Sequence, residues 1–115
     1  MELVALLGTG KGTWGQVAGV VNRGDWDKII LIGDNSTRQF NVKKDFEFIE
    51  LKGSTILDLK NEIIRKLKGK IDGTEVAISI ASGDGKEHMA LISALLSLPV
   101  GIRFAVLTKD GLVFM

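Results

Sequence analysis

The chain has 115 residues, no cysteine and one histidine, and its charged side chains nearly cancel to a net charge of +1. The absence of cysteine excludes disulfides, iron–sulfur clusters and cysteine-based zinc sites, and a single histidine argues against a histidine-based one. Charges of both signs are mixed along the chain, which argues against a broad surface for duplex nucleic acid. We therefore expect one domain, residues 1–115, with no metal, no cofactor and only a local anion site.

The first residues and the hydropathy pattern predict where the protein works. The chain starts Met-Glu-Leu-Val, without the basic segment of a signal peptide, and none of its apolar runs approaches the ~20 residues of a bilayer span. We expect no secretion signal, no membrane partner and a cytoplasmic location.

The first half of the chain predicts strands separated by loops and one helix. An apolar strand is predicted at 3–7, and a helix follows from residue 14 to about 23 because its apolar residues recur at helical spacing. A second strand is predicted at 28–32. It ends at residues 33–36, Gly-Asp-Asn-Ser, which favour a turn, and a third strand is predicted at 46–51.

The second half repeats this pattern. Ser54 or Thr55 is suited to cap a helix that runs to about residue 67, and a fourth strand is predicted at 76–80. A second glycine-rich loop then leads into a helix that stops near Pro99. Two last strands, 102–107 and 112–115, flank an Asp-Gly pair that is typical of a hairpin turn.

The strands are continuously apolar rather than alternating, which is typical of a parallel sheet covered by helices on both faces. The sequence thus predicts an α/β fold, a Rossmann-like three-layer sandwich with a mainly parallel sheet and a C-terminal hairpin. The glycine-rich loops at 8–15 and 82–86 each follow a strand and precede a helix. Both loops should therefore meet at the carboxyl edge of the sheet, where such folds bind ligands.

The first glycine loop departs from the P-loop of nucleoside triphosphatases. With Gly10-Lys11 as the anchor, the motif needs a glycine at position 5 and Ser or Thr directly after the lysine, but this chain has Ala5 and Gly12 there. The stretch 10–15, Gly-Lys-Gly-Thr-Trp-Gly, does match the dinucleotide fingerprint, with Asp34 as the acidic partner. A mononucleotide- or dinucleotide-binding Rossmann-like protein of unknown reaction therefore remains the alternative.

Both readings share the same physics of anion binding. Glycines let the backbone approach a phosphate, successive N–H groups point at it, and the next helix adds a partial positive charge. For a single loop, an equally good interpretation is that the glycines only turn the chain from strand to helix. Two such loops, each with a lysine, Lys11 and Lys86, favour a binding site.

The second loop carries a family resemblance. Residues 82–96, Ser-Gly-Asp-Gly-Lys followed by His-Met and a small-plus-aliphatic helix, resemble the late motif of CRISPR-associated Rossmann-fold (CARF) domains. The loop Gly8-Thr9-Gly10 resembles the loop after the family's first strand. Asp84 stands where the family has a neutral glycine; it would oppose an anion unless it bonds a ribose hydroxyl or caps the helix.

The resemblance implies a homodimer that binds cyclic oligoadenylate across its two-fold axis, since a symmetric ring can meet identical loops twice. Lys11 and Lys86 would then neutralise phosphates. Hydroxyls would come from Thr9, Thr13 and Ser82, and backbone amides would come from Gly10, Gly12, Gly83 and Gly85. Gly8 and Asp84 complete the implied ligand-binding set.

Standalone members of this family often degrade the ring, which implies a metal-independent ring nuclease as a further expectation. Such a reaction needs a ribose hydroxyl held in line and a cation beside the phosphate. The candidate catalytic residues are Lys86, Lys11 and His88. The plainer interpretation of His88 is an exposed residue in the first turn of its helix.

The remaining candidates have plain alternatives too. Asp34 and Ser36 follow the second strand and can read a base or a ribose, although a solvated turn has the same composition. Trp14 can stack on an adenine, but its helical spacing favours packing in the core or a dimer. We interpret the lysines at 43–44 and 60–70 as solvated surface.

Overall fold

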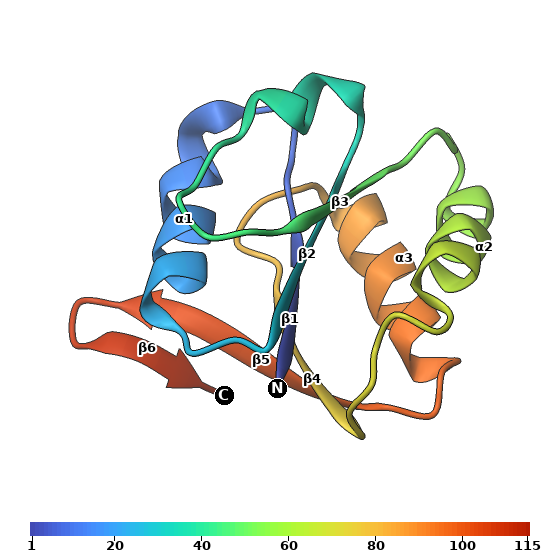
Figure 1. Ribbon diagram of the computed structural model, residues 1–115. Helices are drawn as coiled ribbons and strands as arrows, with labels where there is room; N and C mark the ends of the chain where they lie inside the picture. Colours follow the sequence, from blue (N-terminus) through green and yellow to red (C-terminus); the bar gives the residue numbers. More distant parts are fainter.

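A twisted sheet lies between one helix on one face and two helices on the other (Figure 1). The computed structural model describes residues 1–115. Its strands are β1 (Glu2–Leu6), β2 (Lys28–Gly33), β3 (Glu47–Glu50), β4 (Glu75–Ser79), β5 (Gly101–Thr108) and β6 (Gly111–Phe114). Its helices are α1 (Trp14–Arg23), α2 (Ile56–Leu67) and α3 (Gly85–Leu96), and two short 3₁₀ helices are η1 (Lys11–Thr13) and η2 (Asn35–Gln39).

The sheet has the order β3-β2-β1-β4-β5-β6. The first five strands are parallel, and β6 pairs antiparallel with β5 through the hairpin that the Asp-Gly pair predicted. The Rossmann-like three-layer sandwich with its C-terminal hairpin is therefore confirmed. None of the helices is long and apolar enough to cross a bilayer.

The apolar strands are buried on both faces, as their continuous hydrophobicity predicted. In β1, Val4 and Leu6 pack into the core cluster under α2 and α3, whereas Leu3 and Ala5 pack into the cluster under α1. All four are fully buried. Because successive side chains of a strand point to opposite faces, a central strand needs apolar residues at every position here.

Every predicted strand and helix is present, with its ends moved by at most three residues. The main difference lies at 33–36, which the sequence marked as a turn. There Asp34 accepts a hydrogen bond from the Ser36 N–H at 2.9 Å and starts η2. The Asp34 side chain, which favours a turn, caps a short helix instead, because a bond from a side-chain oxygen to the N–H two residues later occurs in both structures.

A buried carboxylate fixes the connection from β3 to α2. Glu62 of α2 is only 6% exposed, and its carboxylate accepts the N–H groups of Lys52 and Gly53 at 2.9 to 3.1 Å and the Lys66 ammonium at 2.9 Å. Burial alone would raise the pKa of Glu62, but these hydrogen bonds outweigh it and lower that pKa. Glu62 thus holds the chain that enters α2.

We expect Glu62→Gln to lower the free energy of unfolding by about 1–3 kcal/mol near neutral pH, because the loop N–H groups lose a charged acceptor. The folded-state pKa of Glu62 lies below its unfolded value, so its contribution is present above the unfolded pKa and is lost as the pH falls through the folded pKa. Denaturant titrations at several pH values measure this. The Gln variant should lose part of the acid dependence, whereas the exposed-carboxylate control Glu75→Gln should keep it; equal curves would contradict the role of Glu62.

Candidate functional site at the two glycine loops

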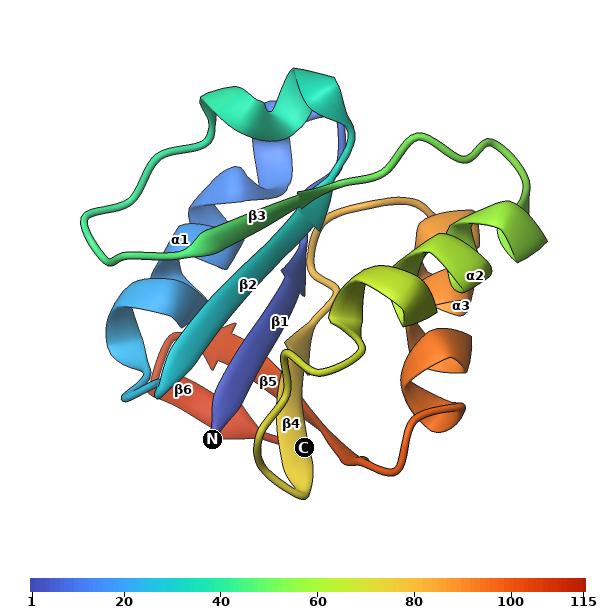
Figure 2. The ribbon, with the colours of Figure 1, turned by 45° about the vertical axis from the view of Figure 1, so that its right-hand side comes forward.

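The site lies where two adjacent strands send the chain to opposite faces of the sheet. β1 pairs with β4, yet β1 leads through the first glycine loop to α1, and β4 leads through the second glycine loop to α3. Figure 2 shows α1 and α3 on opposite sides of these two strands. Such a switch point opens a crevice at the carboxyl edge of a parallel sheet. The prediction that both loops meet at one edge is confirmed.

The two loops are held in contact by a buried serine. The Ser82 hydroxyl is 1% exposed and accepts the Gly8 N–H at 2.7 Å and the Thr13 hydroxyl at 2.7 Å. A Cβ on Gly8 would lie 2.6 Å from the Gly83 nitrogen, so only glycine allows this approach. Ser82 and Thr13 therefore fasten the loops to each other, rather than presenting free hydroxyls as the sequence predicted.

A polar hollow of about 380 Å³ opens between the loops. It has no hydrophobic residue in its lining, which consists of Gly8, Thr9, Gly10, Gly12, Thr13, Gly83, Asp84 and Glu87. A Cβ added at Gly10 or Gly12 would meet no atom within 4 Å, so the backbone there is open to a visiting group. Seven of the eleven predicted ligand-binding residues line this hollow.

The two helix starts beside the hollow differ in how their N–H groups are satisfied. α1 and η1 have no side-chain cap, since Gly10 carries no side chain and Thr13 bonds to Ser82. α3 has a complete capping box: Asp84 accepts the Glu87 N–H at 2.8 Å and Glu87 accepts the Asp84 N–H at 2.9 Å. The start of η1 and α1 therefore has no side-chain acceptor of its own, whereas the α3 end is closed by its own carboxylates.

The carboxylates give one side of the hollow a negative character. Burial raises the pKa of Glu87, and the nearby charges of Asp84 and Asp34 add to the increase, against the hydrogen bond from the Asp84 N–H and the His88 charge, which lower it. The sequence analysis missed Glu87. Its signal was available, because Asp84 and Glu87 have the Asp-x-x-Glu spacing of a capping box directly after a loop.

The two expected lysines do not line the hollow. The Lys86 ammonium donates to the Ser54 carbonyl at 2.7 Å, and the Lys11 ammonium donates to the Gln39 side chain at 3.1 Å. Successive helix residues point about 100° apart, so Lys86 faces the start of α2 while Glu87 faces the hollow. The sequence therefore predicted correctly that both lysines lie in or beside the two loops, but it did not show that their side chains point away from the hollow.

The other sequence candidates lie around this hollow rather than in it. The His88 ring is half-buried, and its Nε2 lies 2.8 Å from the Ser82 carbonyl, which it can approach only as a donor. His88 thus supports the second glycine loop through the Ser82 carbonyl, and it is not the exposed first-turn residue of the plainer interpretation. The Asp34 carboxylate accepts both the N–H and the hydroxyl of Ser36, so these two residues satisfy each other.

The two glycines of the second loop, Gly83 and Gly85, differ in backbone conformation and in position relative to the hollow. Gly85, which the sequence analysis placed among the amide donors, starts α3 with an ordinary backbone angle and open space around it, and it does not line the hollow. The left-handed conformation belongs to Gly83, at φ +96°. That conformation turns the chain sharply after Ser82 and brings the Gly83 backbone against Gly8.

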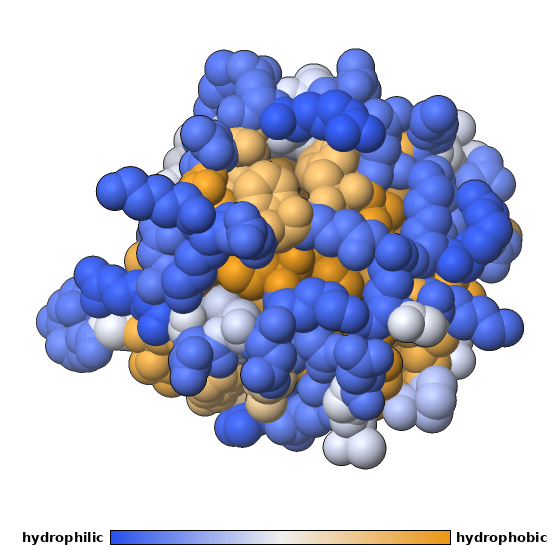
Figure 3. All heavy atoms as spheres, viewed as in Figure 1, coloured by the Kyte–Doolittle hydropathy of each residue, from blue (hydrophilic) through white to orange (hydrophobic).

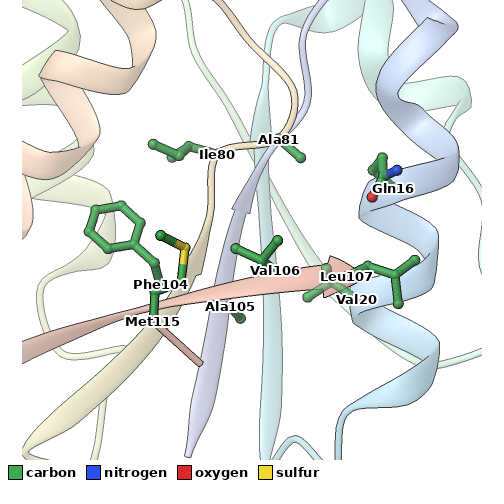
Figure 4. Close-up of a pocket in the computed structure, with 9 residues that line it drawn as sticks. All are labelled: Gln16, Val20, Ile80, Ala81, Phe104, Ala105, Val106, Leu107 and Met115. Carbon is green, nitrogen blue, oxygen red and sulfur yellow. The ribbon is translucent and has the colours of Figure 1, made fainter. Parts of the chain in front are cut away.

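A second, apolar hollow of about 360 Å³ lies next to the first and was not predicted (Figure 4). It forms where β5 continues past β4 to pair with β6, since the β4–β5 register ends at Ile78 and Phe104. Its lining includes Val20 of α1 and Ala81, which precedes Ser82. Ser82 thus separates the apolar hollow from the polar one along the chain.

Trp14 closes the site on the α1 side. Its indole N–H donates to the Gly8 carbonyl at 2.9 Å, and its ring meets Phe40 edge to face, with ring centres 5.7 Å apart. Phe40 is buried in the core cluster under α1. Trp14 therefore packs against the core, as its helical spacing predicted, and also fixes the first glycine loop.

No protein-family model matches the chain, and no curated protein matches it. Among solved structures, protein VC1899 from Vibrio cholerae is similar, with a TM-score of 0.69 and 17% sequence identity over 99% of this chain. The likeness establishes the fold alone. The chain spans 33% of the length of the Vibrio cholerae protein.

The contact between Gly8 and Gly83 makes a sharp stability prediction. Gly8→Ala should lower the free energy of unfolding by about 1–3 kcal/mol, because its methyl group overlaps backbone atoms that cannot rotate away. Gly10→Ala in the same loop should change it by less than about 0.5 kcal/mol, because that methyl group enters open space. Chemical denaturation of both variants measures the difference, and equal stabilities would show that the loops are not in contact.

Proposed function

We propose that the polar hollow binds a ribonucleotide, and that the ligand is a cyclic oligoadenylate, as the CARF resemblance implies. The observation that carries the proposal is the uncapped start of α1 facing a hollow built from glycine backbone. Free N–H groups at a helix start bind phosphate, and the helix dipole favours its negative charge. The position at the β1–β4 switch point supports this assignment.

The two sides of the hollow suggest how such a ligand lies. The phosphate belongs at the first loop, because Asp84 and Glu87 repel an anion on the α3 side. Carboxylates accept hydrogen bonds, so these two residues are suited to ribose hydroxyls or to an exocyclic amine. The apolar hollow beyond Ser82 offers a surface for the face of a base.

The arrangement favours binding over cleavage of the ring. Hydrolysis needs a cation beside the reacting phosphate, whereas the Lys11 and Lys86 ammonium groups bond to Gln39 and to the Ser54 carbonyl. His88 is likewise bonded to a backbone carbonyl. We therefore propose a sensor that holds the ring intact, with the ring nuclease as the competing outcome of the experiment.

A direct experiment mixes the purified protein with cyclic tetra-adenylate or cyclic hexa-adenylate in the presence of a metal chelator. We expect binding by calorimetry and an intact ring by chromatography; linear products would show a nuclease instead. ATP and NAD are tested in parallel, because the dinucleotide-like stretch at 10–15 supports the alternative. Binding of ATP or NAD without either ring would overturn the cyclic ligand, and no binding of any of them would overturn the nucleotide site.

A matched pair of variants places the ligand in the hollow. Gly12→Gln adds a side chain to a residue that lines the hollow, and Gly15→Gln adds the same side chain one turn along, outside it. Because both positions have open space, both variants should fold. We expect Gly12→Gln to weaken ring binding at least about tenfold by blocking the backbone approach, and Gly15→Gln to leave it unchanged. Equal affinities would move the ligand elsewhere.

The expected homodimer has a candidate surface beside this site. Leu57 in the first turn of α2 is 69% exposed and Met89 in the second turn of α3 is 59% exposed. Both helices begin at the carboxyl edge, and the bond from Lys86 to Ser54 holds their first turns together. Two-fold pairing through this surface would place two copies of the hollow near each other.

We expect Leu57→Glu to shift the protein from dimer to monomer, because it puts two like charges into an apolar contact. Leu96→Glu is the matched control, since Leu96 is 72% exposed at the opposite end of α3. Light scattering during size-exclusion chromatography gives the masses. A wild-type monomer, or a dimer that Leu57→Glu leaves intact, would contradict this surface.

A further inference from the structure

A groove along the free edge of β3 collects much of the chain's positive charge. It has a volume of about 540 Å³, and its lining residues come mainly from β3 and from residues 65–70 at the end of α2 and just after it. Eight of its ten lining residues are charged. The cations are Arg38, Lys52, Arg65, Lys66, Lys68 and Lys70. This groove is separate from the polar hollow and shares no residue with it.

The charge of the groove differs in sign from that of the rest of the protein. Its six cations and two carboxylates give a net charge of +4. The whole chain carries +1, so all other residues together sum to −3. The face drawn in Figure 3 is hydrophilic over α2, where four of the cations lie in or just after the helix. A field of this kind attracts a negatively charged partner to one place on the surface.

Some of these cations are already neutralised and others are free. Glu50 pairs with Arg38 at 2.9 Å and with Lys52 at 4.0 Å. Glu47 pairs with Lys70, and Glu62 pairs with Lys66 at 2.9 Å. By contrast, Arg65 and Lys68 are exposed and form no ion pair. The lysines at 66–70 are therefore more than a solvated surface. The fold gathers them with other cations in one groove, whose carboxylates are too few to neutralise all the positive charge.

The backbone of β3 adds a second binding feature. β3 is an edge strand that pairs only with β2. Leu51 N–H donates to the Gly33 carbonyl at 2.8 Å, and alternate residues of a parallel strand face the same neighbour. Phe48 and Glu50 therefore turn their backbone groups outward. The Lys66 ammonium already occupies the Glu50 carbonyl at 2.7 Å, which leaves the Phe48 N–H and C=O and the Glu50 N–H free.

The groove has no platform on which a nucleic-acid base can stack. Its one aromatic residue, Phe48, is half-buried in the core cluster under α1, and the Arg38 guanidinium lies over its ring at 4.8 Å. Single-stranded nucleic acid relies on such stacking for much of its affinity. An exposed strand edge instead binds an extended peptide through backbone hydrogen bonds.

We infer that this groove docks an acidic, extended peptide segment of a partner protein, which adds a strand to the β3 edge while its carboxylates meet Arg65 and Lys68. Cations along an edge repel basic strands and discourage neutral ones. The same charges therefore select for carboxylates. The inference stands independently of nucleotide binding at the polar hollow.

A labelled peptide of alternating Glu and Val, about eight residues long, tests this by fluorescence anisotropy with the full chain. We expect binding that weakens as salt rises from about 0.05 M to about 0.5 M. The same peptide methylated on alternate backbone nitrogens keeps its charge but loses its strand donors, and should bind at least about tenfold more weakly. Equal binding of both peptides would overturn strand addition.

Two charge-matched variants locate the contact. The double variant Arg65→Glu/Lys68→Glu should weaken peptide binding at least about tenfold, whereas Lys43→Glu/Lys109→Glu changes the net charge equally at exposed sites outside the groove and should have little effect. Circular dichroism checks that both fold. Equal loss in both variants, tighter binding of a single-stranded RNA oligomer than of the peptide, or no binding of the peptide would each overturn the proposal.

Discussion

The contact between Gly8 and Gly83 is the constraint on which the candidate site depends. The Gly8 backbone approaches the Gly83 backbone so closely that a Cβ on Gly8 would overlap it, and the buried Ser82 hydroxyl, 74 residues along the chain from Gly8, joins the two segments. This contact sets the distance between the start of α1 and the start of α3. It therefore fixes the width of the polar hollow, and no single loop could have built that hollow alone.

The two loops that meet at this contact have unlike chemistry. The first, glycine-rich loop places no side-chain acceptor at the start of η1 and α1. In the second loop, the carboxylates of Asp84 and Glu87 cap the start of α3, and they also line the hollow. A hollow with donors on one wall and acceptors on the other suits a ligand that carries both phosphate and hydroxyl groups. This combination is what makes a ribonucleotide a better candidate than a simple anion.

The charge distribution separates two surfaces of different chemistry. The carboxyl edge of the sheet carries backbone donors and carboxylates, whereas the cations are concentrated along the β3 edge and α2. Glu62 organises the cationic surface, because it holds the loop from β3 into α2 and also binds Lys66 in the groove. One buried carboxylate thus positions both the exit of β3 and part of the cationic wall.

The sequence by itself determined the order of elements, the parallel sheet and the meeting of the two glycine loops, because continuous apolar runs can be buried only between two layers of helices. It left two roles open for Asp84, a bond to a ribose hydroxyl or a helix cap, and the structure shows the cap. Only the tertiary structure decided which way side chains point. The Lys86 ammonium bonds to Ser54 and the Lys11 ammonium bonds to Gln39. The Ser82 hydroxyl bonds to the Gly8 N–H between the two loops. Strand and helix periodicity is a local property and is written in the residues, whereas the partner of a long or polar side chain depends on neighbours that only folding brings together.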